Sequence, residues 1–187
     1  MARLEADPDW VAKRAEEESV RQQREAEYRR AEEPLVAELR GAGYAVESAW
    51  DLVNTSTPYP EALPILLSHL QRPYPGAVRE GIARALAVRP ARFGWDVLTR
   101  LFRQETEERV KDGLAVAIAA TADEEVIDEV IALARDRQHG SSRLLLLRAL
   151  ERSKSPRARA ALMELGTDPE LEKEIQVNLR RLKTSKR

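Results

Sequence analysis

The sequence has no cysteine, two histidines and no long apolar run. Without cysteine there are no disulfides, thiol nucleophiles or thiolate metal sites. His69 and His139 lie 70 residues apart, and neither has a second ligand at metal spacing, so we expect no metal site. No run of about 18 apolar residues could span a bilayer, and the start, M-A-R-L-E-A-D-P-D-W, lacks the apolar core of a secretory signal. We therefore expect a cytoplasmic protein with no membrane contact.

Catalytic motifs and a strong charge imbalance are also lacking. G-x-S-x-G, G-x-x-x-x-G-K-[ST] and G-x-G-x-x-G do not occur, so the chain has no recognised nucleophile elbow or phosphate loop. The acid pairs Glu107-Glu108 and Asp123-Glu124 fall at expected helix starts, where negative charge is stabilising without catalysis. The formal net charge of −1 argues against a protein that coats nucleic acid. We expect no enzyme and no cofactor.

What the sequence does contain is a nine-residue pattern that returns at a constant interval. Val78–Leu86 reads V-R-E-G-I-A-R-A-L, Val110–Ile118 reads V-K-D-G-L-A-V-A-I and Ser142–Leu150 reads S-R-L-L-L-L-R-A-L, each displaced by 32 residues. A degenerate fourth copy, Leu171–Leu179, follows 29 residues later. A fixed period in the thirties, built from helices, is typical of a solenoid whose units cannot bury their apolar faces alone.

A preceding helix keeps the same apolar register in each unit. The equivalent positions are Leu63/Trp95/Ile127, Leu66/Leu98/Val130 and Leu70/Phe102/Ala134 in the first helices, and Ile82/Leu114/Leu146, Ala85/Ala117/Ala149 and Leu86/Ile118/Leu150 in the second. The spacing follows the i, i+3, i+4, i+7 rule of an amphipathic helix. The sequence thus predicts an all-α fold, a short α-solenoid of helical hairpins over residues 48–187, with repeats at about 59–91, 92–124, 125–157 and 158–183.

Residues 1–47 form a charged helical segment and cap in this interpretation. A solvated helix begins near Pro8, with Trp10 as its anchor on the body, and a second helix runs from Pro34 to Arg40. Ser48 is expected to cap a short helix that ends at Val53. The first helix is either solvent-facing with one packed edge or an arm that binds a partner.

The pattern V-R-x-x-x-A-x-A-L after an apolar helix resembles the HEAT-repeat family over about residues 59–183. That resemblance implies antiparallel helix pairs whose second helices line a concave face. The family's basic residue after valine is kept at Arg79 and Lys111, and Arg143 follows Ser142 in the third copy. The regular aspartate before each second helix is missing, so the family's acid–base ladder along the turns is not expected.

Five cations on the second helices are the candidate partner-binding residues: Arg79, Arg84, Lys111, Arg143 and Arg148. Spaced cations could meet the spaced anions of an acidic protein or a phosphate backbone. The alternative is that each pairs with a nearby carboxylate or carbonyl and orients the stack. Residues 125–157 hold seven bases and five acids, so an anion site should lie toward the C-terminal half.

Four further residues could form a contact edge: Tyr59, Tyr74, Arg89 and Arg92. The two tyrosines each precede a proline and could instead pack in the turns. Trp95-Asp96 is similar to the aromatic and acidic residues of DNA glycosylases built on HEAT-like repeats, but Trp95 falls in a core position of the repeat register.

The sequence therefore favours a non-catalytic module that binds a protein, such as an adaptor or an immunity-like protein, on a concave face. The partner's identity is not encoded in any motif. A nucleic-acid-binding protein, glycosylase-like in the extreme case, is the alternative.

Overall fold

The structure of the protein is a computed structural model that describes residues 8–169, 171 and 172. This part of the chain is all-α, with nine α-helices, two 3-10 helices and no strand. The elements in order are α1 (Pro8–Gly41), α2 (Ala49–Val53), α3 (Ala62–Leu70), α4 (Gly76–Ala85), η1 (Arg89–Gly94), α5 (Trp95–Gln104), α6 (Glu108–Thr121), α7 (Ile127–Arg135), η2 (Arg137–Ser142), α8 (Arg143–Arg152) and α9 (Pro156–Leu165). Most of the degenerate copy at Leu171–Leu179 lies outside the described residues.

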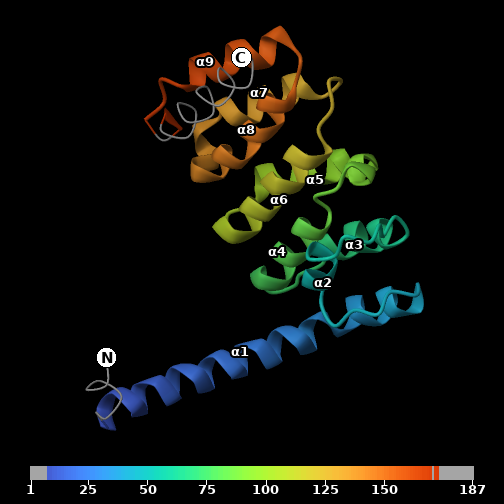
Figure 1. Cartoon of the computed structure of the whole chain (residues 1–187), viewed down its shortest axis with the longest axis vertical. Coiled ribbons are helices and arrows are strands. Elements are labelled where there is room, and N and C mark those ends of the chain that lie inside the picture. Colours follow the sequence, from blue (N-terminus) through green and yellow to red (C-terminus); the bar gives the residue numbers. More distant parts are fainter. Residues whose placement is uncertain (1–7, 170, 173–187) are drawn as a thin grey trace.

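α1 lies along one end of the body, and its N-terminal half extends past the other helices (Figure 1). The expected break at Pro34 is wrong, because the helix continues through it from Pro8 to Gly41. Proline removes one backbone hydrogen bond there, but Leu35 and Leu39 are fully buried and hold the segment on the body. Trp10 is not the expected anchor: among the described residues its ring is covered by Arg14 of the same helix, 4.8 Å away.

α2 begins where the sequence predicts. The Ser48 side chain accepts a hydrogen bond from the Trp50 amide, and the Asp51 carboxylate accepts from the Ser48 amide in return. A second carboxylate reaches this helix start from α1, since Glu32 accepts from the Ala49 amide at 2.6 Å. Burial raises the pKa of Glu32 against the lowering effect of this hydrogen bond. Glu32 thus fastens α1 to the N-terminus of α2, a role that its sequence context does not signal.

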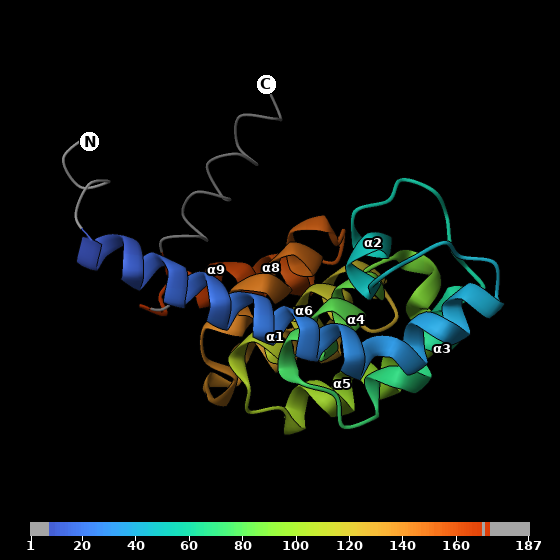
Figure 2. The ribbon, with the colours of Figure 1, turned by 90° about the horizontal axis from the view of Figure 1, so that it is seen from below.

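The remaining helices pack in pairs, α3 with α4, α5 with α6 and α7 with α8, and the second helices also pack on one another in chain order. Figure 2 shows α4 and α6 between α2 on one side and α5 on the other, with α8 beside α9. All eighteen positions that the repeat register assigns to the core are buried, and none is more than 5 % exposed. Each large apolar side chain buried in this way contributes about 1.5–3 kcal/mol. The prediction of an all-α fold with this core is confirmed.

Glycine lets two of these second helices approach closely. A Cβ on Gly113 of α6 would lie 3.1 Å from the Glu80 carbonyl oxygen and 3.1 Å from the Ala83 Cβ, both on α4. Glycine inside a helix costs about 1 kcal/mol relative to alanine, so its presence here is explained by packing. The equivalent position in α4 is Gly81, which accommodates the Trp50 ring of α2 in the same way.

Polar pairs join the first helices of successive units. They run from α3 to α5, from α5 to α7 and from α7 to α9: Arg100–Gln71 at 2.9 Å, Arg103–Glu129 at 2.5 Å and Arg135–Glu164 at 2.5 Å. These polar contacts therefore connect the first helix of each unit to the first helix of the next. Exposed pairs of this kind contribute about 0–1 kcal/mol each, so they set the register of the stack more than its stability.

Two of the segments between the helices are 3-10 helices. The helix α4 ends at Ala85, and Arg89–Gly94 forms the separate 3-10 helix η1. Gly140 in η2 has φ +55°, a conformation that glycine adopts without strain, and it turns the chain into α8. Over the described part of the chain, no helix combines the length and apolar character needed to cross a membrane.

Candidate functional site

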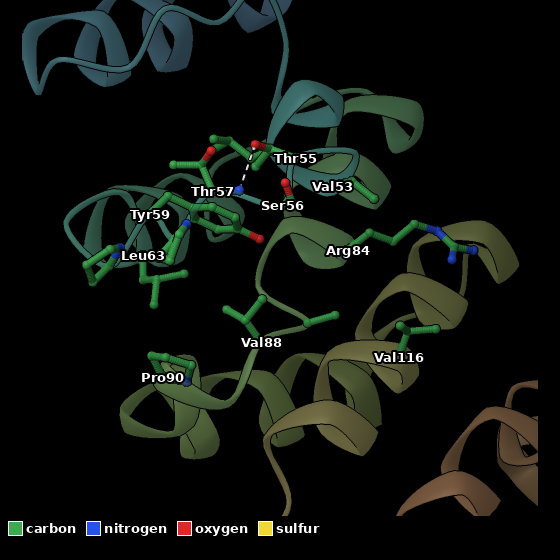
Figure 3. Close-up of a pocket in the computed structure, with 14 residues that line it drawn as sticks. Val53, Thr55, Ser56, Thr57, Tyr59, Leu63, Arg84, Val88, Pro90 and Val116 are labelled. Carbon is green, nitrogen blue, oxygen red and sulfur yellow. Dashed lines mark hydrogen bonds between the residues drawn. The ribbon is translucent and has the colours of Figure 1, made fainter.

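The main candidate site is an apolar pocket of about 620 Å³ between the segment 52–60 and the C-terminal end of α4, with Val116 of α6 beside it (Figure 3). Its lining is mostly aliphatic, aromatic or proline, with the three hydroxyl residues Thr55, Ser56 and Thr57 on one side. Cavities of about 300–1,000 Å³ are typical of ligand sites. We call this cavity the apolar pocket.

The wall of the apolar pocket is held in place by Tyr59. Its ring is 9 % exposed, and its hydroxyl donates a 2.8 Å hydrogen bond to the Ala85 carbonyl at the end of α4. Burial raises the pKa of this phenol, so the hydroxyl remains a donor at neutral pH. The preceding turn is closed by a 3.1 Å bond from the Thr57 amide to Thr55 Oγ1. The pocket is preformed in consequence.

Arg84 is the one charged residue that lines the apolar pocket. Figure 3 shows its side chain extending from α4 across to α6, with the guanidinium away from Tyr59 and Leu63. Its Nε donates to Glu80 at 2.9 Å, and 31 % of the side chain is exposed. The pocket lining has hydroxyls but no carboxylate or imidazole that could take a proton from them. Its chemistry suits the binding of an apolar group next to a cation.

A second cavity of about 430 Å³ lies beside the first, because Pro90 lines one and Arg89 the other. We call it the basic cavity after its four cations, which outnumber its carboxylates Asp123 and Glu124. The cations are Arg89, Arg92, Arg152 and Lys154. In the 32-residue period Arg89 and Arg92 stand where Thr57 and Pro60 stand in the apolar pocket, and Ala122 stands where Pro90 does. The two cavities thus partly correspond to one place in successive units.

Three of the five predicted partner-binding cations make contacts within the chain. Arg143 is fully buried and forms a 3.0 Å ion pair with Asp168, because the turn before α8 folds over it. Arg79 pairs with Glu105 at 2.6 Å, and the Lys111 ammonium donates to the Glu105 carbonyl at 3.1 Å. These side chains connect the turns of neighbouring helix pairs, which is the alternative that the sequence left open.

Glu105 shows how such a connection works. Its carboxylate also accepts from the amides of Thr106 and Glu107, both at 2.9 Å, just before α6 starts. Burial raises the pKa of Glu105, but these backbone bonds and the Arg79 guanidinium outweigh it and leave the pKa below its ordinary value. Arg79 therefore stabilises a helix start and is not free for a partner.

Arg84 and Arg148 keep their place among the candidates. Arg148 is exposed on α8 and makes no ion pair or hydrogen bond with any residue the structure describes. Val116 occupies the equivalent position on α6, between the two arginines in the repeat register. This substitution of valine for arginine is the sequence signal that could have located the apolar pocket.

Of the four residues of the expected contact edge, the two tyrosines pack within the chain and the two arginines are at least partly exposed. Tyr59 is buried, so it is not an exposed contact, and the half-buried Tyr74 donates to or accepts from His69 Nδ1 at 2.7 Å. Arg89 is exposed and Arg92 is partly so, with an ion pair to Asp123 at 3.0 Å and its guanidinium 5.1 Å from the Trp95 ring. The arginine half of this edge borders the basic cavity.

Trp95 and the histidines belong to the interior. Trp95 is 3 % exposed, as the repeat register predicts, and its Nε1 donates to Glu129 at 2.6 Å. Buried His69 bridges Tyr74 to Glu38 of α1, with Nε2 at 2.8 Å from the carboxylate. Within the described residues no cluster of potential ligands could hold a metal ion.

Comparisons with protein-family models, with curated proteins and with solved structures find no match for this chain. The assignment of function therefore depends on the residues of the two cavities.

Proposed function

We propose that the chain is a HEAT-like repeat protein in which residues 48–187 form one α-solenoid and residues 1–47 a charged helical cap. The 32-residue period supports this architecture, since equivalent positions are buried in all three described helix pairs. The packing of α4 on α6 and of α6 on α8, in chain order, supports it as well.

We further propose that this solenoid is a non-catalytic module that binds a protein partner. The observation that carries this proposal is the apolar pocket: a preformed cavity of about 620 Å³ with a mainly apolar lining and a single cation. Soluble proteins use such exposed apolar hollows with a polar rim as interaction sites. Arg84 supplies a charge at the edge of this pocket, and Arg89 lies next to Pro90 of its lining. Arg79, Lys111 and Arg143 contribute indirectly, by holding the turns.

Affinity capture of the tagged full chain from an extract of its native cells tests this function. Thr57→Trp fills the mouth of the apolar pocket from an exposed loop, and Ser68→Trp places the same ring on an exposed position of α3 outside both cavities. We expect one stoichiometric protein that Thr57→Trp loses and Ser68→Trp keeps.

The same eluate tests the nucleic-acid alternative. Nucleic acid that is released as salt rises, with a log–log slope of roughly −0.9 per phosphate neutralised, would replace the proposal. A partner kept by both variants would place the interface elsewhere on the chain.

A further inference from the structure

The two cavities together indicate which side chains a bound partner presents. This inference rests on the proposed binding function. The apolar pocket lacks carboxylates and has one partly exposed cation, Arg84, at its edge. A polar side chain would lose its water contacts there with few partners to replace them. The pocket therefore selects a large aliphatic or aromatic side chain.

The basic cavity next to it selects the opposite chemistry. Its four cations face two carboxylates, and part of this charge is already engaged: Arg92 pairs with Asp123, and Arg152 donates to the carbonyls of Ala119 and Ala122 at 2.7 and 3.4 Å. Glu124 accepts from the Lys154 amide and the Ser153 hydroxyl.

Two cations of the basic cavity remain without such engagement. Within the part of the chain that the structure describes, neither the Arg89 guanidinium nor the Lys154 ammonium makes a hydrogen bond or an ion pair. Both residues are exposed. A partner carboxylate can therefore approach them without displacing an internal pair, which is the condition for a favourable contact at an exposed rim.

The distance between the two cavities sets the spacing in the partner. They partly correspond to one place in successive helix pairs, and packed helices lie about 8–10 Å apart. An extended chain rises about 3.3 Å per residue. An anchor in the apolar pocket and a carboxylate at Arg89, one period after Thr57, are then about three residues apart in an extended segment. Lys154 stands about two further periods along the chain, so its carboxylate lies further along the same segment.

We propose that the edge formed by the apolar pocket and the basic cavity binds an extended acidic segment of a partner protein, with an apolar anchor in the pocket and carboxylates at Arg89 and Lys154. The charge complementarity of the two unengaged cations selects this occupant over a basic or neutral segment. Arg84 is not counted with them, because its guanidinium is already paired with Glu80.

The test is a selection of random peptides of about twelve residues, displayed as a library and captured on the immobilised full chain. We expect the enriched pool to carry a large apolar residue with an Asp or Glu about three positions away and a further Asp or Glu beyond it on the same side. The selected peptides are then measured by fluorescence polarisation against Arg89→Glu/Lys154→Glu and against Thr57→Trp. We expect each to weaken binding by about tenfold, which corresponds to about 1.4 kcal/mol.

Matched controls separate the site from general charge and from folding. Arg72→Glu/Arg159→Glu makes the same charge change at two exposed arginines that line neither cavity, and Ser68→Trp adds the same ring elsewhere. Both controls should bind like the unmodified chain, and equal thermal melts of all variants exclude unfolding.

Enriched peptides without acidic residues, or acidic peptides that bind Arg89→Glu/Lys154→Glu unchanged, would overturn the inference. If those peptides still depended on Thr57, the proposed protein-binding function would stand with another recognition chemistry. A library with no enrichment would also overturn the inference, whereas the capture of a folded partner from cell extract judges the proposed function independently.

Discussion

Replacement of Arg143 by methionine should unfold the chain at a much lower temperature than replacement of Arg148, five residues along the same helix. The Arg143 side chain is fully buried, with its Nη1 3.0 Å from Asp168 and its Nε 3.0 Å from the Gly140 carbonyl. Methionine keeps most of the length and apolar surface but removes the ion pair with Asp168, whose side chain is itself buried at 7 % exposure. Breaking a buried pair from one side costs about 3–5 kcal/mol.

For a chain of 187 residues, 1 kcal/mol shifts Tm by about 2–4 °C, so Arg143→Met should lower Tm by about 6–20 °C. Arg148→Met changes an exposed side chain and should stay within about 0.5 kcal/mol of the unmodified chain. Thermal melts followed by far-UV circular dichroism compare the two. Equal melting temperatures would refute the assignment of Arg143 to the interior and return it to the partner-binding residues.

Three further predictions concern packing and pH. Gly113→Leu should destabilise the chain by about 1–3 kcal/mol in urea titrations, because its Cβ would lie 3.1 Å from the Ala83 Cβ; an unchanged midpoint would contradict the close approach of α4 and α6. Burial and, next, the charge of Lys111 lower the pKa of His139 in the folded chain. Below about pH 6.5 the unfolded chain therefore binds a proton at His139 more readily than the folded chain does, and the free energy of unfolding falls as pH drops. His139→Leu should flatten the fall in Tm between about pH 7 and 5, and an unchanged slope would contradict this. Glu32→Ala should cost about 1–2 kcal/mol by removing a helix cap from α2, and protection of the α2 amides from hydrogen exchange should fall; unchanged protection would show that α2 does not need it.

Much of the fold follows from the sequence because the apolar positions repeat. A displacement of 32 residues relates Leu66 to Leu98 and Ile82 to Leu114, and all four are fully buried. Helices whose apolar residues recur at the same positions of a repeat bury those residues against the equivalent helices of the neighbouring repeats. The period thus predicts both the helices and their core without knowledge of any contact.

The roles of the cations could not be predicted in the same way. Three arginines on the second helices have different surroundings. Arg143 is fully buried, Arg79 is paired with Glu105, and Arg148 is exposed. The difference comes from the turns, since Glu105 and Asp168 approach from the next unit. Such partners lie about one repeat away in the chain, and the helical period carries no information about which way a turn folds.

The candidate site was missed for a related reason, because it is built from departures from the period. Thr57 and Pro60 belong to the loop before α3, and 32 residues later their places are taken by Arg89 and Arg92. One position in successive units is therefore lined by hydroxyl and apolar groups in the first case and by cations in the second. A regular solenoid repeats its surface as it repeats its core, so a partner would find no unique position along it. On the proposed binding function, the change from an apolar to a basic cavity between adjacent units would give the bound segment both a direction and a fixed register.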